Sequence, residues 1–298
     1  MRVITLTVGM CLCAAVVVGQ TPAAGPLQSE LKASFVRQVE RAAAAVDGVV
    51  GYVVTDLTTK EQIAAKLERQ PFPTASTIKL SILYELLKQA EAGTLALDTP
   101  APLNRAQVVG GSGVLQHLAS PVLSLRDDAA LMIIVSDNTA TNVVIDAVGM
   151  DKVNARMSAM GLADIRLRRK MMDLAAVRRG DENVASPASL ATIAELLWRG
   201  EGLSKESRDA ALKILREVEG QVRGAVPGSV PVFLKTGSLD GVRAEAAVVE
   251  VQGRPFSLAV MTTYLARDED GDRAIREIAS AASSYFDRLA RSGAYGRR

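Results

Sequence analysis

The sequence predicts a mixed α/β (α+β) fold, in which helices flank an antiparallel sheet built from both chain ends and an all-helical region is inserted between them. Three observations lead to this expectation. Strand-like segments lie near both ends of the 298-residue chain, the middle has helical apolar spacing, and the last three strand-like segments follow one another after short turns. Strands joined by short turns pair antiparallel, and strands at both ends of a helical middle favour one shared sheet.

The N-terminal part supplies a helix, two strands and a second helix. Residues 28–46 have the apolar spacing of a helix. Residues 49–59 and 61–73 have the composition of two strands joined by a short polar turn. Residues 76–93 are again helical in spacing and end on a glycine, which is common just after a helix.

The remaining chain predicts a helical middle and three C-terminal strands. Residues 94–205 consist mostly of helical segments broken by polar loops. Strands are expected over residues 230–238, 243–251 and 255–265, and a last helix over residues 270–289. We therefore expect a discontinuous α/β domain from residues 25–75 and 206–298, and a helical domain from residues 76–205 that carries a long loop at about 166–185.

The first 24 residues have the pattern of a secretory signal. Arg2 is followed by an apolar run over residues 3–18 and then by small residues. An uncleaved anchor is the alternative interpretation. Both cysteines of the chain lie inside the apolar run, so the mature protein would contain no thiol nucleophile and no disulfide. We expect a secreted or periplasmic protein.

Composition narrows the choice of partners. The formal net charge is +2, which gives no reason to expect nucleic acid. His117 is the only histidine, and without cysteines only carboxylates remain as metal ligands, so we expect no metal and no cofactor. The expected partner is a small-molecule substrate, and the expected state is a monomer.

Ser76 and Lys79 form the first motif that can carry chemistry. On a helix, residues three apart share one face. Lys79 could take the proton of Ser76 if burial or a second positive charge lowered the lysine pKa. Serine is also an ordinary residue at a helix start, so this motif alone does not establish a nucleophile.

Two further motifs follow along the chain. Ser136-Asp137-Asn138 offers a hydroxyl that can relay a proton and an amide that can hold a carbonyl. Lys235-Thr236-Gly237 ends a predicted strand, where a cation and a hydroxyl can bind a carboxylate. In isolation, each is equally typical of a polar turn or a strand end.

Together and in this order, the three motifs resemble those of class A β-lactamases and related penicillin-recognising serine enzymes. The segments "SDNTATN" at 136–142 and "GGSGVLQHL" at 110–118 resemble a helix start and an active-site wall loop of that family. The resemblance covers residues from about 28 to 290. It implies the fold described above and acylation of a serine by a β-lactam or a similar acyl donor.

The resemblance also implies a role for each matching residue. For acylation it implies Ser76 as the nucleophile, Lys79 as its base, Ser136 as the proton carrier, and the backbone N–H groups of Ser76 and Ser238 as the oxyanion hole. For binding it implies Asn138 at the substrate amide and Lys235, Thr236 and Gly237 at the substrate carboxylate. Arg243 could assist there or be an ordinary surface residue.

The chain departs from the family in the loop that handles the deacylating water. The family carries Glu-x-x-Leu-Asn there, and aligning residues 166–182 places Met171 at the glutamate and Ala175 at the asparagine. A thioether cannot accept a proton at neutral pH. Three alternatives stay open: Asp173 acts as a relocated base, deacylation follows another route, or the acyl-enzyme is long-lived. The alternatives to a β-lactamase-like hydrolase are therefore a D,D-peptidase or esterase, and a non-catalytic ligand-binding protein.

Overall fold

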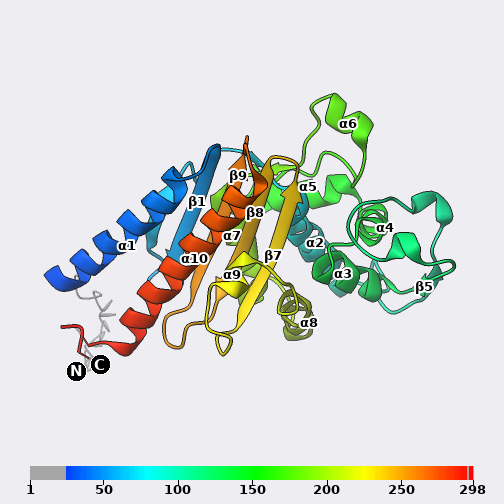
Figure 1. Cartoon of the computed structure of the whole chain (residues 1–298). Coiled ribbons are helices and arrows are strands. Elements are labelled where there is room, and N and C mark those ends of the chain that lie inside the picture. Colours follow the sequence, from blue (N-terminus) through cyan, green and yellow to red (C-terminus); the bar gives the residue numbers. More distant parts are fainter. Residues whose placement is uncertain (1–24, 294, 298) are drawn as a thin grey trace, which may run out of the picture.

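The computed structural model describes residues 25–293 and 295–297, and its centre is an antiparallel five-stranded sheet (Figure 1). The strand order is β2-β1-β9-β8-β7. The strands are β1 (Val49–Asp56), β2 (Gln62–Lys66), β7 (Val232–Leu239), β8 (Val242–Val249) and β9 (Phe256–Thr263). Because β1 pairs with β9, the sheet joins the two ends of the chain, and the predicted fold class is confirmed.

The hairpin between β7 and β8 sets the register on which the site depends. Asp240 and Gly241 form its turn, and Gly241 has a φ of +69°, a conformation that glycine adopts without strain. Counting back from the pair Leu239–Val242, the register places Thr236 directly opposite Glu245.

Helices cover both faces of the sheet (Figure 1). One face carries α1 (Pro26–Ala44) and α10 (Asp268–Arg291), which lie side by side, and the other carries α7 (Pro187–Arg199). Phe35 of α1 stacks on Tyr285 of α10 with ring centroids 4.8 Å apart, and Phe286 stacks on Phe256 of β9 at 4.5 Å. These aromatic pairs fix the two terminal helices to each other and to the sheet.

The helical region lies beyond β7 in Figure 1. Its elements include the 3₁₀ turn η1 (Ala75–Ile78), α2 (Lys79–Glu91), α3 (Leu125–Ile134), α4 (Asn138–Val148), α5 (Met150–Ala159) and α6 (Leu174–Arg178). Short elements complete the chain: β3 (Phe72–Pro73), β4 (Ala101–Pro102), η2 (Arg105–Gln107), η3 (Leu115–His117), β5 (Val122–Leu123), β6 (Val184–Ala185), α8 (Lys205–Leu215) and α9 (Gln221–Gly224). The division into two domains stays a prediction.

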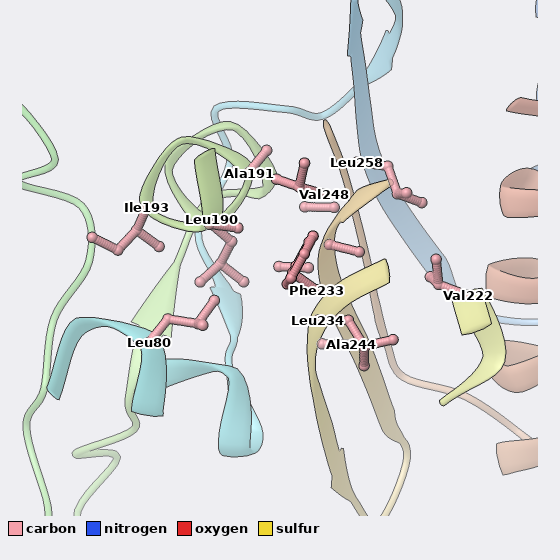
Figure 2. Packing of buried hydrophobic residues seen from close by; sticks show 14 of the residues in the cluster. Leu80, Leu190, Ala191, Ile193, Val222, Phe233, Leu234, Ala244, Val248 and Leu258 are labelled. Carbon is pink, nitrogen blue, oxygen red and sulfur yellow. The ribbon is translucent and has the colours of Figure 1, made fainter. Parts of the chain in front are cut away.

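One hydrophobic core links the sheet with α7 and α2 (Figure 2). Leu190 of α7 and Leu80 of α2 lie on one side of the sheet beside Phe233 of β7 and Val248 of β8. Leu258 of β9 lies on the other face, because its neighbour Ser257 is the residue that pairs with Val248. Burial of such side chains contributes about 1.5–3 kcal/mol each. The core therefore holds the start of α2, which follows Ser76, against the sheet.

The predicted signal at residues 1–24 lies outside the described residues. Among the helices of residues 25–293, none combines the length and the apolar content that crossing a bilayer would require.

Asp128 on α3 gives a stability prediction. Its side chain is 4% exposed, and its Oδ1 has no hydrogen-bond partner among the described residues. Burial first, and then the charges of Asp137 and Asp127, raise the pKa of Asp128 to about 7. Because this pKa exceeds the value of about 3.9 in an unfolded chain, ionisation of Asp128 opposes folding, and its contribution to stability falls between pH 4 and 7.

Asp128→Asn is therefore expected to increase the free energy of unfolding at pH 8 by about 2 to 4 kcal/mol. At pH 4, where the carboxyl is protonated in the folded state and about half protonated in the unfolded chain, the same substitution should change the free energy of unfolding little. Urea denaturation at the two pH values measures both quantities. An equal effect at pH 4 and pH 8 would contradict this account of Asp128.

Candidate active site

Ser76 lies in η1, the tight turn between β3 and α2. Ala75 before it has a φ of +46°, a conformation that is costly for alanine and that occurs mainly at functional sites. A Cβ on Gly237 of β7 would lie 2.7 Å from the Thr74 carbonyl oxygen and 2.9 Å from the Ser76 nitrogen, so only glycine allows this approach. Ser76 is partly exposed and lines a cavity of about 510 Å³. The helix predicted from residue 76 thus begins as a 3₁₀ turn and becomes α-helical at Lys79.

Lys79 is a fully buried lysine that lies next to Ser136 and Asn138. Its Nζ donates hydrogen bonds to the Ser136 carbonyl oxygen at 2.8 Å, to Ser136 Oγ at 3.0 Å and to Asn138 Oδ1 at 3.3 Å. Burial, followed by the charge of Lys235, holds the Lys79 pKa well below its usual range, and Asp137 opposes this shift. A lowered pKa favours the neutral amine, which is the form that can accept a proton.

Ser136 lies between two lysines. Its Oγ accepts hydrogen bonds from Lys79 Nζ at 3.0 Å and from Lys235 Nζ at 3.2 Å. Ser136 itself has a φ of +56°, which marks a second strained backbone position at the site. Lys235 is fully buried, and burial lowers its pKa to about 7. The hydroxyl of Ser136 is therefore placed to pass a proton to or from either amine.

Asn138 and Asp137 connect this cluster to the loop at residues 110–118. Asn138 Nδ2 donates to the Gly110 carbonyl oxygen at 3.1 Å, and Asn138 lines the cavity. Asp137 Oδ2 accepts the backbone N–H groups of Val114 at 2.6 Å and Leu115 at 2.8 Å. The Ser-Asp-Asn motif therefore fixes the loop at residues 110–118, which forms one wall of the cavity.

The end of β7 forms the opposite wall. Ser238 lines the Ser76 cavity and also a second cavity of about 270 Å³, which Thr236 and Gly237 line with it. The strand therefore brings Gly237 and Ser238 beside the predicted nucleophile, and Thr236 lines the second cavity.

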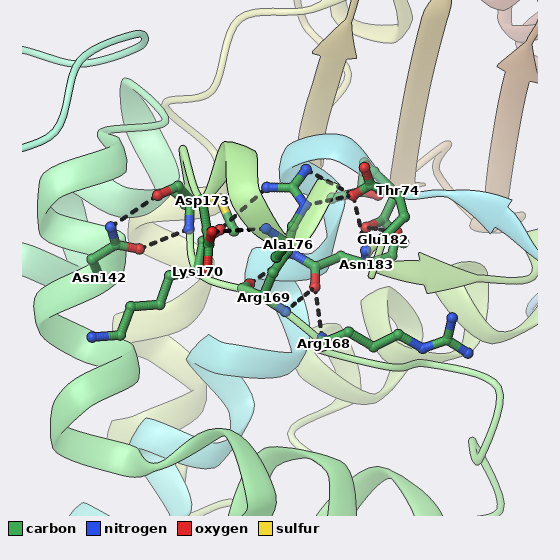
Figure 3. Close-up of polar contacts among 11 residues, drawn as sticks. Thr74, Asn142, Arg168, Arg169, Lys170, Asp173, Ala176, Glu182 and Asn183 are labelled. Atoms are coloured by element: carbon green, nitrogen blue, oxygen red, sulfur yellow. Dashed lines mark hydrogen bonds and ion pairs between the residues drawn. The ribbon is translucent and has the colours of Figure 1, made fainter. Parts of the chain in front are cut away.

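The loop at residues 166–185 lines a third side of the cavity, and Figure 3 shows its polar contacts. The Met171 N–H donates to Asn142 Oδ1 at 2.8 Å, and Asn142 Nδ2 donates to the Met171 carbonyl oxygen at 3.1 Å. Met171 is 7% exposed and lines the cavity that contains Ser76. Asn142 thus fixes the backbone of Met171 from both sides.

The base of this loop is held by a partly buried ion pair and an asparagine (Figure 3). Arg169 forms an ion pair with Glu182 at 2.7 Å. Asn183 Oδ1 accepts the N–H groups of Arg168 and Arg169, and the Asn183 carbonyl oxygen accepts Thr74 Oγ1 at 3.0 Å. Thr74 is two residues before Ser76, so the loop and the nucleophile turn are connected directly.

Two residues named from the sequence lie apart from the lysine cluster. Arg243 forms ion pairs with Asp268 at 2.8 Å and Asp272 at 3.4 Å, and it lines the second cavity. Asp173 Oδ1 accepts the Ala176 N–H at 2.9 Å and caps α6, and Asp173 does not line the Ser76 cavity. The other named residues lie together at the site: Ser76, Lys79, Ser136, Asn138, Lys235, Thr236, Gly237 and Ser238.

Sequence reasoning missed Glu245, a buried carboxyl on β8 opposite Thr236. The sequence contained a signal for it, because Glu245 interrupts the apolar run of a predicted strand. Burying a charge there is costly unless the charge is paired or hydrogen-bonded. Among residues 25–293 and 295–297, no three metal-binding side chains come together. His117 is exposed in η3 and does not line the Ser76 cavity.

Curated relatives give the first comparison. The model of the β-lactamase enzyme family matches residues 33–286. β-Lactamase AST-1 of Nocardia asteroides is 29% identical over 247 residues, which cover 80% of this chain and 79% of that protein. β-Lactamase L2 of Stenotrophomonas maltophilia is 30% identical over 193 residues, which cover 64% of this chain and 62%, less than two thirds, of that protein.

Solved structures support the same family assignment. A β-lactamase from Sphaerobacter thermophilus superposes with a TM-score of 0.77 at 32% identity, covering 84% of this chain and 95% of that one. PBP-A superposes at 0.78 and 26% identity, covering 90% and 99%. A PBP-A variant solved as an acyl-enzyme complex with penicillin G superposes at 0.77 and 26% identity, covering 87% and 96%. The chain therefore belongs to the β-lactamase family and is a serine hydrolase of the class A β-lactamase type.

Proposed function

We propose that this chain is an exported hydrolase in which a β-lactam or a related amide acylates Ser76, and that the acyl group leaves slowly. The observation that carries the proposal is the placement of Ser136 Oγ between the buried amines of Lys79 and Lys235, next to the cavity that Ser76 lines. The acyl-enzyme of the PBP-A variant with penicillin G supports acylation as the first step.

Each residue then has a chemical task. Neutral Lys79 accepts the Ser76 proton as Ser76 Oγ bonds to the carbonyl carbon. The backbone N–H groups of Ser76 and Ser238 stabilise the oxyanion. As the C–N bond breaks, Ser136 passes the proton to the leaving nitrogen. Asn138 binds the substrate amide, and Lys235, Thr236 and Gly237 bind the group beyond the leaving nitrogen, with Arg243 as an outer positive charge.

Release of the acyl group is the slow step in this proposal. Met171 lines the cavity where the family has its water-activating glutamate, and a thioether cannot act as a base. Lack of a general base costs about 10²–10⁴ in rate. Asp173 is the alternative base, and its carboxylate is occupied in capping α6. Met171 therefore also favours a second function, a D,D-peptidase or esterase that acts on cell-wall peptides or small esters.

Labelling with penicillin G tests the proposal. The intact mass of the mature protein should increase by one penicillin per chain, and peptide mapping should place the adduct on Ser76. Ser76→Ala should give no adduct. An adduct that survives Ser76→Ala would show a different nucleophile, and no adduct on the unmodified protein would favour a non-catalytic ligand-binding protein.

Asp173→Asn tests the relocated base separately. Because Asp173 caps α6, we expect the substitution to leave the rate of adduct loss within about twofold, since an asparagine side chain also caps helices well. The half-life of the adduct, followed by mass, measures this rate. A fall by a factor of about 10² or more would instead assign the base to Asp173.

A further inference from the structure

Exposed apolar side chains from two elements border the cavity that contains Ser76. Leu174 and Val177 of α6 are 57% and 41% exposed, and Leu239 at the end of β7 is 37% exposed. All three line this cavity of about 510 Å³. Exposed apolar patches around a cavity are typical of ligand-binding grooves.

The cap of α6 sets which of its side chains share a face. Asp173 Oδ1 accepts the Ala176 N–H at 2.9 Å, and the helix begins at Leu174. Residues three apart on a helix lie on one face. Leu174 and Val177 therefore present one apolar face, and both line the cavity.

The β7–β8 hairpin supplies the second apolar surface. Leu239 pairs directly with Val242 next to the turn, and residues opposite each other in an antiparallel pair have their side chains on the same face. Val242 is 7% exposed and lines the cavity with Leu239. The hairpin therefore adds two adjacent apolar side chains to those of α6.

Met172 brings a further apolar side chain next to Asn138. Its φ of +61° is costly for methionine and persists only where the surroundings fix it. A Cβ built on Gly111 would lie 3.3 Å from Met172 Sδ and 2.6 Å from Asn138 Nδ2, so the thioether and the amide both reach the space beside Gly111. Met172 is 44% exposed and lines the cavity. We call the following five residues the apolar lip: Met172, Leu174, Val177, Leu239 and Val242.

The polar side chains at the base of the loop already bind one another (Figure 3). Arg169 donates to Glu182 Oε1 through Nε at 3.1 Å and through Nη2 at 2.7 Å. Asn183 Oδ1 accepts the N–H groups of Arg168 and Arg169, and Asn183 Nδ2 donates to the Arg169 carbonyl oxygen at 3.1 Å. Asp240, exposed in the hairpin turn, also lines the cavity, and its carboxylate disfavours an anionic ligand. This part of the cavity therefore favours an apolar group.

The acyl arm of the substrate, the part attached to the reacting carbonyl, points towards the apolar lip in the proposed chemistry. Thr236 lines the second cavity, on the side where the group beyond the leaving nitrogen binds. The arm leaves the carbonyl carbon on the other side, where its amide meets Asn138 and the lip begins with Met172.

We propose that the apolar lip binds the acyl arm, so that the protein selects acyl donors with a large apolar arm, aromatic or alkyl, over donors with a small or an anionic arm. This selection rests on the proposed function, because the arm belongs to the group that acylates Ser76. Binding of the arm does not need the reaction and can be measured without it.

Three penicillins that differ in the arm test the selection. 6-Acetamidopenicillanic acid carries a methyl group there, penicillin G a benzyl group, and carbenicillin a benzyl group with an added carboxylate. Penicillin G should acylate Ser76 about 10–100 times faster than the acetamido compound, because its ring gains apolar contact. It should also react about tenfold or more faster than carbenicillin, whose carboxylate would be desolvated beside the lip. Equal second-order rate constants, followed by intact mass, for penicillin G and either of the others overturn the proposal.

Leu174→Ser and Leu239→Ser test whether the lip causes the selection. Each should lower the ratio of the penicillin G rate constant to the acetamido rate constant by a factor of about 4–15, as when one or two methylene groups lose contact with the ring. Leu27→Ser is the matched control, because Leu27 of α1 is 62% exposed and does not line the Ser76 cavity. It should leave the ratio within about twofold. A ratio that stays the same in both Leu174→Ser and Leu239→Ser overturns the proposal.

Non-reacting ligands separate this proposal from the proposed function. The methyl ¹³C resonance of Met172, assigned by its loss in Met172→Leu, is followed in Ser76→Ala during titration with phenylacetylglycine or acetylglycine. Phenylacetylglycine should give the larger saturable shift, because its ring contacts the lip. If penicillin G forms no adduct, the proposed function fails, and this titration still decides the role of the lip. Equal responses to the two ligands, including none, overturn it.

Discussion

Lys79→Met is expected to lower the rate constant for acylation of Ser76 by a factor of about 10²–10⁴. Lys79 is fully buried, its pKa is held low by burial and by Lys235, and its Nζ is bonded to both oxygens of Ser136. Methionine has a similar length and fills the same space, but it offers neither a base nor a hydrogen-bond donor. The rate is measured by stopped flow with a chromogenic cephalosporin and checked by intact mass.

Lys88→Met is the matched control for Lys79→Met. Lys88 lies on the same helix, where it bonds Glu91 at 2.8 Å and the Gly202 carbonyl oxygen at 2.6 Å, away from the cavity. Lys88→Met should be acylated at a rate within about twofold of the unmodified protein. Lys88 lies away from the cavity, and surface substitutions usually change the free energy of unfolding by no more than about 0.5 kcal/mol. Equal acylation rates in Lys79→Met and the unmodified protein would remove Lys79 from the mechanism.

Met171→Glu is expected to speed loss of the acyl group by a factor of about 10²–10⁴. Asn142 fixes the backbone of Met171 through two hydrogen bonds, and the side chain lines the Ser76 cavity. A carboxyl there would be largely buried, which raises its pKa towards the range in which a general base works at neutral pH. Turnover of the cephalosporin at steady state measures the gain.

Met171→Gln separates base chemistry from a change of shape. Glutamine matches glutamate in size and polarity but cannot accept a proton. It should release the acyl group as slowly as the unmodified protein. Equal acceleration by Glu and Gln would show that the loop limits release through its packing, and no acceleration by either would place the obstacle outside Met171.

The sequence predicted the fold class because its signals are local. Alternating apolar residues and short turns predict β7, β8 and β9, and the two chain ends each carry strands, so one shared sheet was expected. The three motifs also pointed to the site. Two of them lie at element boundaries, Ser76 before α2 and Ser136 before α4, and Lys235 lies in the middle of β7.

Contacts between distant segments could not be predicted in the same way. The environment of the Glu245 carboxyl depends on its register with Thr236 and on the N–H groups of residues 221 and 222. The connection from Thr74 to Asn183 joins segments 109 residues apart. The start of α2 was misplaced because the close packing of Gly237 against the turn at Ser76, a tertiary contact, favours a 3₁₀ turn with a strained Ala75 over a regular helix start.

The amount of cephalosporin product released per protein molecule tests the central claim most directly. Mixing excess chromogenic cephalosporin with the unmodified protein should give a burst of one product per Ser76, followed by a slow steady state, with the intact mass showing a stable adduct. Many fast turnovers without a burst would contradict the account, because they would require an effective base that neither Met171 nor the capped Asp173 supplies.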